Sequence, residues 1–130
     1  MKNFLILAVV IFSFQFVDAQ EQILQPLDTI YNYKDVEVKP EFPGGVRDFY
    51  QFIAKNYIMP NVKKLRGKVY VAFVIEKDGS IEEVKILRDL GYGTGVEAIK
   101  VLKKSPKWIP AQLKGEKVRS RFNLPISLQS

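Results

Sequence analysis

The chain has 130 residues and a formal net charge of +6, and it contains neither cysteine nor histidine. Without cysteine it can form no disulfide and no thiolate metal site, so packing alone must hold the fold. Without histidine it lacks the usual general base of nucleophilic catalysis. The composition therefore argues against an enzyme, and we expect no cofactor and no metal site.

The first 19 residues have the pattern of a secretory signal peptide. A positive charge precedes the apolar run Phe4–Val17, and small residues stand at positions 17 and 19, which a signal peptidase reads. The alternative is an uncleaved membrane anchor. A spanning helix needs about 20 apolar residues, and Ser13 and Gln15 interrupt this shorter run. We therefore expect cleavage before Gln20 and an exported protein, with an uncleaved membrane anchor as the alternative.

The positive charge is concentrated in the second half of the chain, residues 61–130. A basic domain can bind nucleic acid, but an exported protein seldom meets any. We expect a solvated surface that attracts acidic partners or anionic surfaces, and no nucleic-acid binding.

Residues 20–40 show no sustained period and are expected to form an extended lead-in, with a short edge strand possible at Val36–Val38. The domain follows in residues 41–130. Pro43-Gly44-Gly45 predicts a turn that opens a helix, and Pro60 ends it. Apolar residues recur there at helical spacing: Val46, Phe49, Tyr50, Phe52, Ile53 and Tyr57. Asn61 could cap one further turn through Leu65.

A β-hairpin is predicted next. Residues 68–76 alternate but are apolar on both faces, which is typical of a central strand covered on both sides. Lys77-Asp78-Gly79-Ser80 predicts a tight turn in which Gly79 takes a positive φ. Residues 81–87 return as the partner strand, with Val84 and Ile86 facing the core.

A glycine-rich segment, residues 91–95, leads into a second helix that ends before Pro106. A phosphate-binding loop would need a parallel-sheet context and a following Gly-Lys-Ser/Thr, so a turn is the better interpretation. Trp108 lies between two prolines, where an indole can fill the corner between helix and last strand. The neighbouring carboxylates Glu82 and Glu83 cannot converge on a substrate, because adjacent strand residues point to opposite faces.

The last predicted strand, Val118–Leu128, contains a proline. Proline cannot donate to a strand ladder, so this strand is expected at a sheet edge with the missing N–H directed outward. Because hydrogen-bonding direction alternates along a strand, the same outward direction is shared by Arg119, Arg121, Asn123, Pro125 and Ser127. Such an edge can accept an added strand. The alternative is an edge protected from aggregation by its basic residues and proline.

Several short motifs in this order resemble the C-terminal domain of TonB, over residues 36–128. They are Glu41-Phe42-Pro43-Gly44-Gly45, Gly67-Lys68-Val69, Asp78-Gly79, the glycine run with Glu97-Ala98, Ser105-Pro106-Lys107-Trp108 and Leu124-Pro125-Ile126. The resemblance implies an α+β fold, a three-stranded antiparallel sheet with two helices packed on one face. It also implies structural roles for Gly45, Gly67, Asp78, Gly79, Pro106 and Trp108. The family usually has Tyr-Pro where this chain has Met59-Pro60.

The resemblance implies a periplasmic module that docks the TonB box, an extended peptide of an outer-membrane receptor, in energy-dependent transport. The expected partner is a TonB-dependent receptor or another periplasmic protein, bound through the five outward-directed residues of the last strand. Two alternatives stay open. One is a short, membrane-anchored energy transducer working with the inner-membrane ExbB/ExbD motor, and the other is a homodimer formed by strand exchange at the same edge.

Overall fold

The computed structural model describes residues 29–130. The predicted signal peptide, its cleavage before Gln20 and the start of the lead-in lie outside these residues. The part of the lead-in that is described contains a short strand and a single 3-10 turn, neither of which the sequence analysis predicted.

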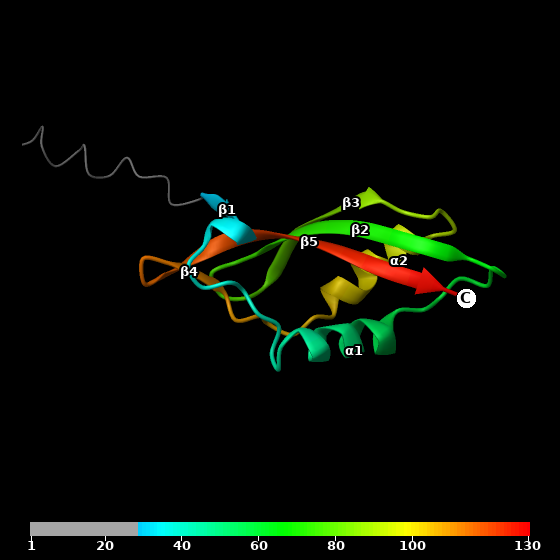
Figure 1. Ribbon diagram of the computed structural model, residues 1–130, viewed down its shortest axis with the longest axis horizontal. Helices are drawn as coiled ribbons and strands as arrows, with labels where there is room; N and C mark the ends of the chain where they lie inside the picture. The colour runs from blue at the N-terminus through cyan, green and yellow to red at the C-terminus, as the bar shows by residue number, and fades with distance from the viewer. Residues whose placement is uncertain (1–28) are drawn as a thin grey trace, which may run out of the picture.

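Two α-helices and five strands follow one another along the described chain (Figure 1). In order they are β1 (Ile30–Asn32), the 3-10 helix η3 (Tyr33–Asp35), α1 (Val46–Asn56), β2 (Arg66–Ile75), β3 (Ile81–Arg88), α2 (Thr94–Lys103), β4 (Ala111–Leu113) and β5 (Glu116–Gln129). The expected helices and the three long strands are therefore present within a few residues of their predicted bounds.

The sheet has the strand order β1-β5-β2-β3, and β4 pairs with the beginning of β5. β2 is antiparallel to both β3 and β5, whereas β1 is parallel to β5. The α+β class with two helices is confirmed, but the expected three-stranded antiparallel sheet was wrong, because the sheet is mixed and has additional strands. β1 and β4 have three residues each, too few for a period-2 pattern to be recognised.

The position of β5 also needs a correction. It was expected at the sheet edge along its whole length, but residues 119–121 pair with β1, so that Ser120 and Arg121 lie between β1 and β2. β2 pairs with residues 120–129 of β5. Within residues 29–130, no strand pairs with residues 122–129 on the side away from β2. We call this stretch the open edge.

Both helices contribute to one hydrophobic core together with the inner face of the sheet, so they cover the same face (Figure 1). The core residues come from α1, α2, β2 and β5: Phe49, Ile53, Ala98, Val101, Leu102, Val69, Val71, Phe73, Ile75, Leu124, Ile126 and Leu128. These β2 members have odd numbers and these β5 members even numbers, as expected for strands that present alternate side chains to the core.

Two details of the first helix differ from expectation. Val46 and Tyr50 belong to the predicted apolar stripe but are 68% and 52% exposed. The further helical turn expected through Leu65 is absent, because the backbone N–H groups of this segment donate to acceptors outside a helical pattern. Val62 donates its N–H to the carbonyl of Pro60, and Leu65 donates its N–H to the Ser130 hydroxyl at the end of β5.

Trp108 closes the corner between α2 and the sheet, as predicted, and is only 5% exposed. Its backbone N–H donates to the carbonyl of Gly79 at 2.8 Å, which joins the corner to the β2–β3 turn. Gly79 has the expected positive φ, +90°. The indole N–H donates to the Ser105 hydroxyl at 3.0 Å, so the buried polar group of the ring has a partner.

Candidate functional site

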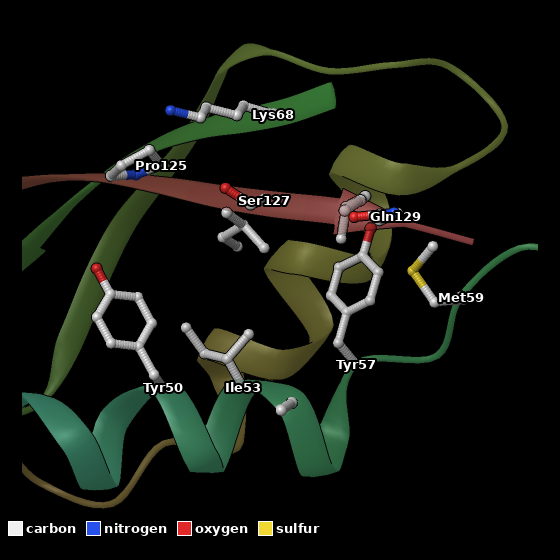
Figure 2. Close-up of a pocket in the computed structure, with 11 residues that line it drawn as sticks. Tyr50, Ile53, Tyr57, Met59, Lys68, Pro125, Ser127 and Gln129 are labelled. Carbon is white, nitrogen blue, oxygen red and sulfur yellow. The ribbon is translucent and has the colours of Figure 1, made fainter. Parts of the chain in front are cut away.

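A groove of about 510 Å³ lies between α1 and the open edge of β5 (Figure 2). It is lined by Tyr50, Ile53, Ala54, Tyr57, Met59, Lys68, Pro125, Ile126, Ser127, Leu128 and Gln129. Its volume is in the range of ligand pockets in proteins. The α1 side chains labelled in Figure 2 point from the helix toward the strand.

The β5 side of the groove carries backbone groups available for pairing. Pro125 lies opposite Tyr70 of β2 and has no N–H to donate, so this must be a non-hydrogen-bonded pair of the antiparallel ladder. By alternation, the neighbouring odd-numbered residues direct their backbone groups away from β2. Asn123 and Ser127 therefore present N–H and C=O groups along the open edge, interrupted only at Pro125.

The α1 side is apolar and partly fixed in place. Tyr50 and Ile53 are spaced i, i+3 and share one helical face, and Tyr57 is the C-cap residue that directly follows α1. The Tyr57 hydroxyl donates to the Thr94 carbonyl at 2.7 Å, which ties its ring to the start of α2. Burial, together with the negative charges of Glu97 and Asp89, raises the pKa of Tyr57 to about 12. The hydroxyl thus stays a hydrogen-bond donor at neutral pH, while the ring forms part of the groove wall.

Of the five residues predicted for partner binding, the structure places three along the open edge: Asn123, Pro125 and Ser127. Pro125 and Ser127 also line the groove. Arg119 and Arg121 lie instead where β1 pairs with β5, opposite Ile30 and Asn32.

Arg119 has a different environment from the one expected for a docking residue. Its Nε and terminal nitrogen donate to the Glu76 carboxylate at 2.8–3.0 Å, and Glu83 lies 3.9 Å away. The two paired side chains are only 19% and 20% exposed. The geometry is a bidentate, mostly buried ion pair, which is stronger than an exposed one. The charge of Arg119 is therefore engaged within the fold.

Replacing Arg119 by alanine should lower the free energy of unfolding by about 1.5–3 kcal/mol, because hydrogen bonds to charged groups are lost and Glu76 loses its partner. Arg121→Ala is the matched control. Arg121 is half-buried but forms no ion pair within residues 29–130, so its loss should lower stability by about 1 kcal/mol or less. Urea denaturation of both variants measures the difference, and equal losses would contradict a structural role specific to Arg119.

Sequence reasoning missed the contribution of α1 and the segment after it. Tyr50, Ile53, Tyr57 and Met59 form the wall opposite β5, whereas the sequence pattern placed the first three only on an apolar helical stripe. The signal was present in the two tyrosines, since their hydroxyls favour positions at the boundary between core and solvent. Which side of the boundary they face depends on packing that the helical period alone does not specify.

The residues expected to have structural roles occupy turns and close contacts. Gly45 is the N-cap of α1 with φ +96°. Gly67 lies in β2 opposite Leu128, and a side chain there would collide with Leu90. Pro106 lies between the end of α2 and Trp108.

Asp78 holds the hairpin turn together. Its carboxylate accepts hydrogen bonds from the backbone N–H and the hydroxyl of Ser80, at 2.9 and 2.6 Å. These bonds favour the ionised form and lower the pKa of Asp78 below its usual range, with Lys107 at 3.8 Å adding to the effect. The carboxylate is therefore a turn-stabilising acceptor at neutral pH.

The described part of the chain contains neither a candidate metal site nor a candidate membrane-spanning helix. Within residues 29–130, no three acidic side chains come together in a group that could hold a metal ion. None of the helices described there is both long and apolar enough to cross a membrane.

Within residues 29–130 the domain thus combines an α+β fold with a strand edge, residues 122–129, that is unpaired beside an apolar helix. The family model of the Gram-negative bacterial TonB protein C-terminal domain matches residues 61–128, more than half of the chain. The chain therefore belongs to the TonB C-terminal domain family, as the sequence motifs predicted. No curated protein and no solved structure shows significant similarity to it.

Membership of this family implies the role of a TonB-like energy transducer in outer-membrane transport and an interaction with TonB-dependent receptors. The family is non-enzymatic, which confirms the prediction made from composition. Its members act in the periplasm or cell envelope.

Proposed function

We propose that this chain is a periplasmic TonB-like module that docks an extended peptide, the TonB box of an outer-membrane receptor, by strand addition along the open edge. The observation that supports this most is the unpaired stretch of β5, residues 122–129, beside a groove lined by α1. Main-chain hydrogen bonds to the edge would supply affinity, and the groove would receive side chains.

The proposed docking surface lies further toward the end of β5 than the surface expected from the sequence. Because β1 already pairs with residues 119–121, a second strand has room only from Phe122 onward. Asn123, Pro125 and Ser127 remain in the proposed site, and the wall formed by α1 joins them. Arg121 lies at the boundary between β1 and the open edge.

The signal peptide and the periplasmic location of the mature chain are part of the proposal. Amino-terminal sequencing of the protein purified from the whole cell envelope, membranes included, should begin at Gln20. A retained Met1 would indicate the membrane-anchored transducer instead. A second copy of the chain could also pair with the open edge, and sedimentation of the purified protein distinguishes this strand-exchanged dimer from a monomer that binds peptide.

Asn123→Pro should weaken binding of a TonB-box peptide by a factor of about two to ten, since it removes one outward N–H and a hydrogen bond is worth about 0.5–1.5 kcal/mol. The matched control is Asn123→Ala, which removes the side chain and keeps the N–H. Fluorescence anisotropy of a labelled receptor peptide gives both affinities.

The fold should survive Asn123→Pro, because Asn123 lies opposite Ala72 in a pair that directs its backbone groups away from β2. Thermal melts of the two variants check this. If peptide affinity is the same in both variants while both are folded, strand addition at the open edge is ruled out.

A further inference from the structure

We infer that the docked peptide is amphipathic in a strand-like pattern, with apolar side chains at alternate positions facing α1 and acidic side chains at the positions between them. This inference rests on the proposed function and adds to it the side-chain chemistry that the site would select.

The alternation follows from the pleat of the sheet. A strand added to the open edge continues the pleat of β5, so its successive side chains point to opposite faces. In β5, Leu124, Ile126 and Leu128 point to the face covered by the helices, while Asn123 and Ser127 are exposed on the other. The added strand must present one set of alternate side chains to α1 and the other set to the outer face.

The face toward α1 is apolar. Tyr50, Ala54 and Met59 line the groove there, and Tyr50 is half exposed, so much of its ring has no covering group within the described chain. The groove volume of about 510 Å³ accommodates side chains the size of valine, leucine or phenylalanine. Covering the exposed ring with an apolar side chain removes both surfaces from water, which favours binding.

The outer face is basic. Lys68 lies opposite Ser127 in the β2–β5 ladder, so both side chains project to the outer face, and both line the groove. Arg121 lies on the same face of β5, two residues before Asn123. No acidic side chain is among the residues lining the groove. An acidic side chain at an outward position of the peptide would therefore meet positive charge, which favours encounter and register.

The probes are two labelled synthetic peptides of identical composition. One alternates valine and glutamate, and the other has all its valines before its glutamates. We expect the alternating peptide to bind roughly tenfold more tightly at low salt, a difference of about 1.4 kcal/mol. Titration by fluorescence anisotropy measures both.

Three variants test which residues of the groove distinguish the alternating peptide. Tyr50→Ala should weaken binding of the alternating peptide roughly tenfold, an effect in the range of an interface anchor. The matched control is Tyr92→Ala, because Tyr92 is similarly exposed but lies in the loop before α2, outside the groove, and it should leave affinity unchanged. Lys68→Gln should weaken binding and reduce its salt dependence. All three replace exposed side chains, and thermal melts confirm that they are folded.

A third peptide separates this inference from the proposed function. It is the alternating peptide with N-methyl groups on one set of alternate backbone amides, prepared in both registers. If neither methylated form loses affinity, binding is not strand addition and the proposed function fails. If methylation abolishes binding but the block peptide binds as well as the alternating one, or Tyr50→Ala has no effect, strand addition stands and the amphipathic pattern is overturned.

Discussion

Replacing Trp108 by alanine should lower the free energy of unfolding by about 3–5 kcal/mol, the usual cost of truncating a large buried aromatic side chain. The indole is 5% exposed and touches rings from four different segments. These are Phe42, Phe49, Phe73 and Phe122, with ring centroids 4.8–5.8 Å from that of Trp108. Removing it leaves a cavity at the point where the segment before α1, α1 itself, β2 and β5 meet.

The control is Trp108→Phe, which keeps an aromatic ring and should cost clearly less than the alanine substitution. It would still lose the hydrogen bond from the indole N–H to Ser105. Urea denaturation monitored by far-ultraviolet circular dichroism measures both variants without relying on the indole signal. A loss below about 1 kcal/mol for Trp108→Ala would mean that the site collapses around the missing ring or that the ring is not buried.

Gly79→Ala should be nearly as damaging, at about 2–5 kcal/mol, for two separate reasons. The first is conformation: φ is +90°, and a residue with a Cβ in the left-handed region costs about 1–2 kcal/mol. The second is space, because a Cβ at Gly79 would lie 2.0 Å from the carbonyl oxygen of Trp108. That oxygen belongs to the backbone, so the whole corner must move, and overpacking of this kind costs about 1–3 kcal/mol.

Gly115→Ala isolates the conformational cost of a Cβ at a positive φ. Gly115 has a similar φ, +77°, in the turn between β4 and β5, but a Cβ there would meet nothing within 4 Å. It should lose only the conformational part, about 1–2 kcal/mol. Equal losses in the two alanine variants would show that the Trp108 carbonyl moves away at no cost, contrary to the tight junction between hairpin and corner described above.

Local sequence patterns were enough to predict the main helices and strands. Helical spacing from Val46 onward, ended by Pro60, specified α1, and period-2 alternation specified β2, β3 and β5. The turn at Gly79 was equally readable, since few residues other than glycine adopt its backbone conformation. The motifs around Trp108 and Pro125 identified the family. All these signals are local, because each arises from the steric preferences of residues a few positions apart.

The position of β5 within the sheet was decided only by the tertiary structure. β1 has three residues and no recognisable pattern, yet it pairs with residues 119–121 and leaves 122–129 open. The ion pair of Arg119 with Glu76 likewise joins residues 43 positions apart. The sequence shows that Arg119 lies in a strand two residues before another arginine, but not that the Glu76 carboxylate, just after β2, accepts hydrogen bonds from it at 2.8–3.0 Å.

The groove, too, could be recognised only in the tertiary structure. Its two walls, α1 and the last residues of β5, are far apart in sequence, and whether Tyr50 faces the core or a groove depends on how far the helix extends beyond the strand edge. Periodicity defines which face of a helix is apolar. The packing of that helix against the sheet decides which part of the apolar face is covered and which part is left for a partner.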